Sequence, residues 1–128
     1  MRLLLDTHVL LVVIDGHKAS LPAGVEALLK DPENEHHLSA ASLWEIAIKC
    51  RLGKLRLVPK LTALPDLLRE LGIQILPINE HHALAAVDPE PATRDPFDRM
   101  LLAQCQIENL RLVTLDRSLL KHQLAARI

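Results

Sequence analysis

The stretch Leu3-Leu4-Leu5-Asp6-Thr7-His8 decides the fold that we predict for this sequence. Three consecutive leucines are typical of a short strand that is buried on both faces. Asp6 follows at once, so that a carboxylate stands where the strand ends. Residues 7–14 then have helical period, and a buried strand that leads directly into a helix indicates a parallel α/β unit.

The rest of the chain alternates between strand-like and helical segments. We predict strands over 3–6, 37–39, 73–78 and 110–115, and a final edge strand over 125–128. We predict helices over 7–14, 22–30, 41–52, 64–71, 80–87 and 97–109, with a proline-rich loop over 88–95. The two longest helices are expected to bury Leu43, Ile46, Ala47 and Cys50, and Leu101, Leu102, Cys105 and Ile107. This alternation predicts an α/β fold in which helices cover both faces of a mostly parallel sheet of about four or five strands.

Length and composition limit what kind of protein this is. The chain has 128 residues, 49% of them hydrophobic, which predicts a single domain over 1–128 with a real core. It contains no signal-peptide pattern and no apolar run near the ~18 residues that span a bilayer. We therefore expect a soluble cytoplasmic protein without membrane contact. Cys50 and Cys105 lack C-x-x-C partners, which predicts two reduced, buried thiols.

The net charge of −1 provides no overall attraction to nucleic acid. Five cations nevertheless fall within twelve residues that contain no acid: Lys49, Arg51, Lys54, Arg56 and Lys60. Two interpretations stay open, a phosphate-facing edge or a helix end whose cations complement the helix dipole. Trp44 and Phe97 are the only large aromatic residues, which argues against a base-stacking platform.

Four acids stand where the predicted strands end or the predicted helices begin. Asp6 and Asp116 would follow two strands, and Glu45 and Asp98 would lie in the first turns of two helices. In a parallel sheet these positions share the carboxyl edge, where open α/β sheets bind ligands. All four carboxylates are therefore expected to face one crevice.

Each acid also has an ordinary structural explanation. Ser42-Leu43-Trp44-Glu45 has the pattern of a capping box, and Asp95-Pro96-Phe97-Asp98 has that of an N-cap followed by a first-turn anion. Asp6 and Asp116 would cap the helices that follow them. Capping alone gives no reason to gather four like charges, whereas a hard divalent cation does. The pattern predicts an Mg²⁺ or Mn²⁺ site with the ligands Asp6, Glu45, Asp98 and Asp116.

Five motifs together resemble the PIN domains of VapC-type toxins. They are LLLDTH over 3–8, SAASLWEI over 39–46, KxxxxKL over 49–55, RDPFDRM over 94–100 and LVTLD over 112–116. The resemblance spans nearly the whole chain and implies a PIN-like three-layer α/β/α sandwich. It implies an Mg²⁺- or Mn²⁺-dependent endoribonuclease, the toxin of a bacterial toxin–antitoxin pair, that cleaves RNA with a metal-activated water. It also implies a homodimer and a cognate antitoxin partner.

The resemblance further implies roles for individual residues. Asp6 and Asp98 would be direct metal ligands, with Glu45 and Asp116 binding directly or through water. Thr7 and Thr114 match positions where such domains place a hydroxyl near the acids. From the residues themselves, Lys49, Lys54, Arg94 and Arg99 are potential RNA or phosphate contacts, and the two arginines could equally pair with neighbouring acids. His8 has two open interpretations, structural at a helix start or catalytic.

Two other classes of function compete with a nuclease. A receiver domain is also parallel α/β with an acidic Mg²⁺ site, but it needs an aspartate at the end of the third strand, where this chain has Pro77-Ile78-Asn79. A catalytically silent binding module, in which the acids only cap helices, would bind no Mg²⁺ at millimolar concentration. A metal titration therefore separates the silent module from the nuclease.

Overall fold

The computed structural model describes residues 1–17 and 20–128, and a parallel sheet lies at its centre. Its four strands are β1 (Arg2–Leu5), β2 (Glu35–Ser39), β3 (Ile73–Leu76) and β4 (Arg111–Val113). They lie in the order β3-β2-β1-β4, and all neighbouring strands are parallel. In the register of the sheet, Leu4 of β1 lies between His37 of β2 and Leu112 of β4.

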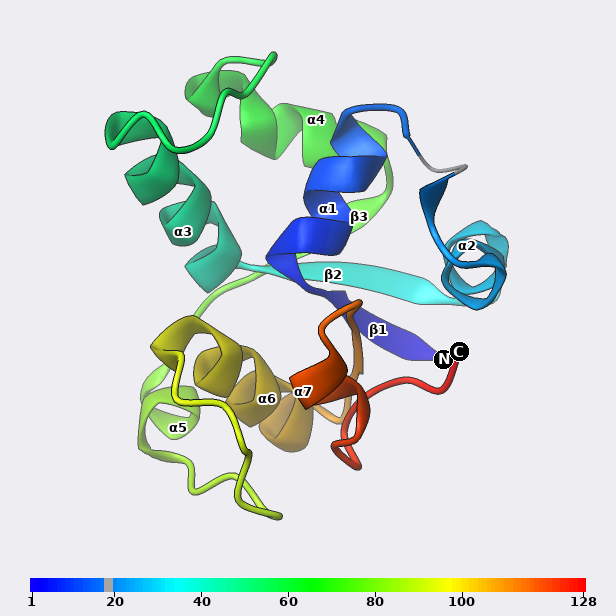
Figure 1. Cartoon of the computed structure of the whole chain (residues 1–128), viewed down its shortest axis with the longest axis vertical. Coiled ribbons are helices and arrows are strands. Elements are labelled where there is room, and N and C mark those ends of the chain that lie inside the picture. Colours follow the sequence, from blue (N-terminus) through cyan, green and yellow to red (C-terminus); the bar gives the residue numbers. More distant parts are fainter. Residues whose placement is uncertain (18–19) are drawn as a thin grey trace.

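Helices cover both faces of this sheet. The first group is α1 (Thr7–Ile14), α2 (Ala23–Lys30), α3 (Ala40–Arg51) and α4 (Leu64–Glu70), the last preceded by a 3₁₀ turn, η2 (Leu61–Ala63). The second group is α5 (Glu80–Leu84), α6 (Pro96–Glu108) and α7 (Arg117–Leu120). Figure 1 shows α1, α3 and α4 on one side of the sheet and α5, α6 and α7 on the other.

The alternation of side chains along β1 explains this layering. Leu3 and Leu5 point to one face, where they join the apolar cluster formed with α1 to α4. Leu4 points to the opposite face and packs with Leu102 of α6 and Leu119 of α7. Because successive residues of a strand face opposite sides, the leucine run fills two cores at once. The predicted three-layer α/β/α sandwich is confirmed.

Several predicted boundaries are wrong in detail. β4 ends at Val113, and α5 ends at Leu84 because Ala85 adopts an extended backbone. The predicted edge strand over 125–128 is reduced to a single bridge between Leu112 and Ala125. Ile107, expected to face inward, is 44% exposed because it lies two residues beyond the buried Cys105 and so faces away from the core.

Two other expectations concern the thiols and the membrane. Both cysteines are free, as predicted, and Cys105 is buried, but Cys50 is only half-buried because it lies at the end of α3. Burial raises the pKa of the Cys105 thiol to about 12, which leaves it protonated and inert. Among the residues that the structure describes, no helix combines the length and apolar character needed to cross a membrane.

Candidate active site

A cavity of about 350 Å³ opens at the carboxyl edge of the sheet, where the strand order reverses around β1. The backbone N–H of Asp6 donates to the carbonyl of Val113 at 3.0 Å, which holds the ends of β1 and β4 together. All four predicted acids line this cavity. Its complete lining is Asp6, Thr7, His8, Leu11, Glu45, Lys49, Asp98, Leu101, Leu115, Asp116 and Leu119.

Asp6 is the most buried of the four acids. It is the N-cap of α1, as predicted, and its Oδ1 accepts a hydrogen bond from the Val9 N–H at 2.8 Å. Burial raises the pKa of the Asp6 carboxyl, and the negative charge of Asp116 adds to the rise. Hydrogen bonds from Thr114 and from the Val9 backbone oppose it. The buried surroundings of Asp6 therefore disfavour its ionised form.

Glu45 reaches the cavity by a route that differs from the predicted capping box. α3 begins at Ala40, and its N-cap is Ser39, whose Oγ accepts from the Ala41 N–H at 3.0 Å. The predicted N-cap, Ser42, lies inside the first turn because β2 runs directly into the helix at Ser39. Glu45 consequently lies in the second turn, and the capping-box prediction is wrong.

The Glu45 carboxylate has partners on both oxygens. Its Oε1 accepts from the hydroxyl of Thr7 at 2.7 Å, and its Oε2 forms an ion pair with Lys49 Nζ at 2.8 Å. The glutamate side chain is 15% exposed and that of Lys49 is 47% exposed. Thr7, which the resemblance placed near the acids, is thus in direct contact with one of them.

Asp98 lies where the sequence predicts it. Asp95 is the N-cap of α6 and accepts from the Phe97 N–H at 2.8 Å, Pro96 is the first helical residue, and Asp98 follows in the first turn. Its Oδ2 accepts from the Thr93 hydroxyl at 3.0 Å. Burial, and then the charges of Asp95, Asp116 and Glu45, raise the pKa of Asp98 to about 6. The negative charges of Asp116 and Glu45 therefore both act on the Asp98 carboxylate.

Asp116 is the N-cap of α7, as predicted, three residues beyond the end of β4. Its Oδ1 accepts from both the N–H and the hydroxyl of Ser118, at 2.9 and 2.8 Å. Its own N–H donates to Thr114 Oγ1 at 3.1 Å. The buried Thr114 side chain also lowers the pKa of Asp6, so this threonine influences two of the acids.

The donor set fits a hard divalent cation, although the carboxylates do not yet converge. Four carboxylates, with hydroxyls and no thiol, are the chemistry that Mg²⁺ or Mn²⁺ prefers. Within residues 1–17 and 20–128, no three His, Cys, Asp or Glu side chains are arranged to hold an ion as they stand. The local hydrogen bonds explain this, because Asp6, Asp98 and Asp116 are each turned toward a donor in their own segment of the chain. The cavity has room for a hydrated ion together with a phosphate group.

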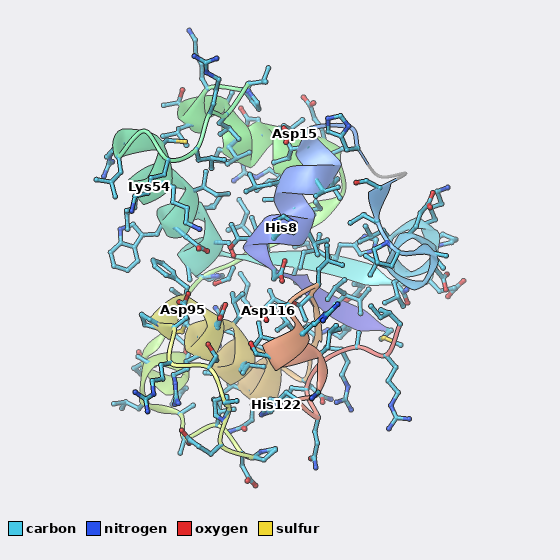
Figure 2. All side chains as sticks on the ribbon, viewed as in Figure 1. His8, Asp15, Lys54, Asp95, Asp116 and His122 are labelled. Carbon is cyan, nitrogen blue, oxygen red and sulfur yellow. The ribbon has the colours of Figure 1, made fainter. Side chains whose placement is uncertain are left out.

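The four cations that were predicted to contact RNA or phosphate do not all lie at the cavity. Lys49 lines the cavity, whereas Lys54, beside the last turns of α3 in Figure 2, and the exposed Arg94 do not. Arg99 pairs with Glu90 at 2.9 Å and with the Thr93 carbonyl at 2.8 Å, so it joins the proline-rich loop to α6. Pairing with a neighbouring acid was one of the two predicted roles of Arg99. Contacts from these cations to RNA stay a prediction.

Histidines play different parts around the site. His8, the second residue of α1, is exposed and lines the cavity, and Figure 2 shows it at the start of this helix. His82 is buried in the cap of α5, where its Nδ1 accepts from the Asn79 N–H at 3.1 Å. The end of β3 thus carries a cap with an asparagine, and no aspartate stands where a receiver domain needs its phosphate acceptor.

Sequence reasoning missed the arrangement of the two aromatic residues. The Trp44 and Phe97 rings meet edge to face with centroids 5.6 Å apart. They line an apolar groove of about 400 Å³ with Ala41, Ile48, Ile78, Pro96 and Met100. A signal for this pairing existed, because each aromatic residue directly precedes a predicted site acid, Glu45 or Asp98.

Comparisons with known proteins agree on one family. The family model described as PIN domain matches residues 3–123. Ribonuclease VapC16 of Mycobacterium tuberculosis is 44% identical over 57 residues, which cover 44% of this chain and only 40% of that protein. The matched segment therefore spans less than half the length of this curated relative.

Two solved structures share the fold. The crystal structure of VapBC2 from Rickettsia felis bound to a promoter DNA fragment has a TM-score of 0.66 at 17% identity, covering 98% of this chain and 96% of that one. A toxin–antitoxin complex from Klebsiella pneumoniae has a TM-score of 0.63 at 19% identity, covering 97% and 95%. At such low identity these likenesses establish the fold alone.

Proposed function

The chain belongs to the PIN domain family, and from this premise we propose that it is a divalent-metal-dependent endoribonuclease, the toxin of a bacterial toxin–antitoxin pair. One observation carries the proposal: four acids from separate parts of the chain line one cavity at the carboxyl edge of the sheet. The similarity to Ribonuclease VapC16 and to the two toxin–antitoxin structures supports it.

The four acids would have different roles in binding a metal ion. Asp6 and Asp98 would be direct ligands, and Glu45 and Asp116 would bind directly or through water. When bound, Mg²⁺ or Mn²⁺ supplies a Lewis acid that lowers the pKa of a coordinated water and neutralises charge on the scissile phosphate. Small rotations of the Asp6, Asp98 and Asp116 carboxylates away from their local donors would bring them toward Glu45, which stays on the Thr7 hydroxyl.

The other cavity residues act on the substrate and on the acids. Hydrogen bonds from Thr114 and the Val9 backbone oppose the rise in the pKa of Asp6 that burial causes, and so favour its ionised form. Lys49 Nζ lies 2.8 Å from Glu45 Oε2, and it would be free to attract an RNA phosphate if that oxygen bound a metal ion instead. Leu11, Leu101, Leu115 and Leu119 form apolar walls, which strengthen these electrostatic interactions by lowering the local dielectric constant.

The proposal includes protein partners. The resemblance implies a homodimer, and we assign a second copy of the chain to the groove around Trp44. This groove is lined almost wholly by apolar residues, and Trp44 is 62% exposed. A cognate antitoxin would be the second partner. A cytoplasmic location and the organisation of residues 1–128 as one domain belong to the same proposal.

Cleavage of a labelled RNA in Mg²⁺ tests the proposed activity. Asp6→Asn and Asp98→Asn should each reduce the rate at least about a hundredfold, since each keeps the side-chain shape and removes one anionic ligand. Asp95→Asn is the matched control, because asparagine caps a helix as well as aspartate does and Asp95 is not among the cavity residues. Full cleavage by either cavity variant would overturn the assignment.

The silent-module alternative makes a different prediction. Three of the four acids make local hydrogen bonds at helix starts, which is all that the alternative needs. If capping were their whole function, Mg²⁺ at millimolar concentration would not bind the wild-type chain. A calorimetric titration of wild type with Mg²⁺ therefore decides between the two.

A further inference from the structure

A short chain of buried hydroxyls connects α1, α3 and the cavity. Thr7 Oγ1 lies 2.9 Å from Ser42 Oγ and 2.7 Å from Glu45 Oε1. Thr7 is the first residue of α1 and follows Asp6, while Ser42 and Glu45 lie one turn apart on α3. The three side chains thereby tie the helix that begins at Asp6 to the helix that carries Glu45.

Chemistry fixes the direction of these hydrogen bonds. A carboxylate oxygen can only accept, so the single hydroxyl proton of Thr7 must go to Glu45. The Ser42 hydroxyl must then donate to Thr7 Oγ1. The resulting order is Ser42 to Thr7 to Glu45, and each donor polarises the next one in the low dielectric of the interior.

Burial decides which contact fixes the orientation of Glu45. Ser42 is 1% exposed and Thr7 is also buried, so their hydrogen bonds are shielded from water. The ion pair from Lys49 to the other carboxylate oxygen involves a half-exposed lysine, and such pairs contribute little to holding a geometry. If Lys49 leaves, Glu45 is still held by the Thr7 hydroxyl. If the Ser42–Thr7–Glu45 hydrogen bonds are lost, the Lys49 ion pair alone does not fix the carboxylate.

Within the described part of the chain, the Ser42 side chain has no structural role apart from its contact with Thr7. Ser39 performs the capping that the sequence assigned to Ser42. Serine inside a helix usually returns its hydroxyl to a carbonyl of the preceding turn, but within the described part of the chain the hydrogen bond of the Ser42 side chain goes to Thr7. The buried Ser42 hydroxyl thus bonds a threonine that itself contacts a cavity acid, which indicates a role for Ser42 in the site.

We propose that Ser42 is a positioning residue that acts through Thr7 to hold the Glu45 carboxylate at the cavity rim, in the orientation that a divalent cation requires. The inference rests on the proposed function, since it concerns the metal affinity of the same cavity. It adds a residue that does not line the cavity and makes no contact with a bound ion.

Mn²⁺ binding in the absence of RNA, measured from the free-ion signal in electron paramagnetic resonance, tests the proposal. Ser42→Ala should weaken Mn²⁺ binding roughly three- to tenfold, less than the 10–100-fold typical of a group that contacts a ligand directly. Thr7→Val, which keeps the shape and removes the hydroxyl that contacts Glu45, should weaken binding about ten- to hundredfold, and Thr7→Ser should bind as wild type does. At saturating metal the kcat of Ser42→Ala for RNA should stay within about twofold of the wild-type value.

Ser39→Ala is the matched control, because it removes a buried hydroxyl from the same helix. It should lower the melting temperature through loss of the N-cap but leave Mn²⁺ affinity unchanged. In a Glu45→Gln background, Ser42→Ala should have almost no further effect on Mn²⁺ affinity, since the two residues act as one unit.

Several outcomes would overturn the proposal. They are wild-type Mn²⁺ affinity in Ser42→Ala, equal affinities in Thr7→Val and Thr7→Ser, and an undiminished effect of Ser42→Ala in the Glu45→Gln background. If the wild-type chain cleaves RNA and binds Mn²⁺ while the Ser42 and Thr7 variants match it, only this inference fails. If wild type binds no Mn²⁺, the proposed function fails with it.

Discussion

At the scale of single residues, Asp98 makes the cost of the gathered acids measurable. Its pKa is raised from 3.8 to about 6, so the folded chain holds this proton more tightly than the unfolded chain does. The free energy of unfolding therefore falls as the pH rises from about 4 through 6, and the loss is complete at neutral pH.

Asp98→Asn should remove this loss. Without metal, the variant should be more stable than wild type at pH 7.5 and nearly equal to it at pH 4. Because Asp98 is partly exposed, solvent screening limits the gain to about 1 kcal/mol. Chemical denaturation in EDTA at the two pH values measures both differences, and a gain of equal size at both would contradict the assignment of the raised pKa.

The same carboxylate should make metal binding depend on pH. Mg²⁺ competes with the proton on Asp98, so its apparent affinity for wild type should rise between about pH 5 and 7 and then level off. In Asp95→Asn the rise should persist at a slightly lower pH, because one repelling charge has been removed. Calorimetry across this range checks the prediction, and a flat profile would exclude Asp98 as a ligand.

The position of Glu45 in its helix and the partner of Ser42 could not be predicted from the sequence. The carboxylates of Asp6, Asp98 and Asp116 could be placed from the sequence because strand ends and proline fix where their helices begin. Ser39 and Ser42 are equally good N-caps on paper, and only the length of β2 decides between them. That choice moved Glu45 by one turn and gave Ser42 a different partner.

At the scale of elements, the cap of α6 should matter for stability and little for chemistry. Asp95→Ala removes the acceptor of the Phe97 N–H and should cost about 1 kcal/mol, whereas Asp95→Asn should be nearly neutral. Thermal unfolding of the two variants measures the difference. If Asp95→Asn lost as much stability as Asp95→Ala, the charge rather than the cap would be responsible.

Elements with strong periodicity were predictable, and weak ones were not. The buried faces of α3 and α6 follow the helical spacing of their apolar residues, apart from Ile107. β2 was predicted too short because His36 and His37 do not look like a buried strand, although His37 is buried and hydrogen-bonds the Leu3 carbonyl. The tail over 125–128 forms one bridge, a tertiary detail that no local pattern encodes.

At the scale of the whole molecule, strand–helix alternation predicted the parallel sheet and its two helical layers. It did not predict the order β3-β2-β1-β4, nor the meeting of Trp44 with Phe97, because both depend on how distant elements pack. The convergence of the acids was predictable only in outline, from the shared edge of parallel strands.

The apolar groove gives a prediction about assembly. Trp44→Glu places a charge in the groove assigned to a second copy of the chain. It should convert the proposed dimer to a monomer without unfolding the chain, because Trp44 is mostly exposed. Light scattering at micromolar concentration measures the mass. Leu84→Glu, at an exposed apolar position that does not line this groove, is the control and should stay dimeric.

Four acids that form a metal site should respond to Mg²⁺, whereas four acids that only cap helices should not. The most direct measurement is the Mg²⁺-induced change in thermal stability at pH 7.5 for wild type, Asp6→Asn and Asp95→Asn. Wild type and Asp95→Asn should gain roughly 2.7 kcal/mol when free Mg²⁺ is about a hundred times its dissociation constant. Asp6→Asn should melt at a higher temperature than wild type in EDTA, because burial makes the ionised Asp6 costly, and should gain much less from Mg²⁺. An equal gain from Mg²⁺ in Asp6→Asn and wild type would contradict the metal site.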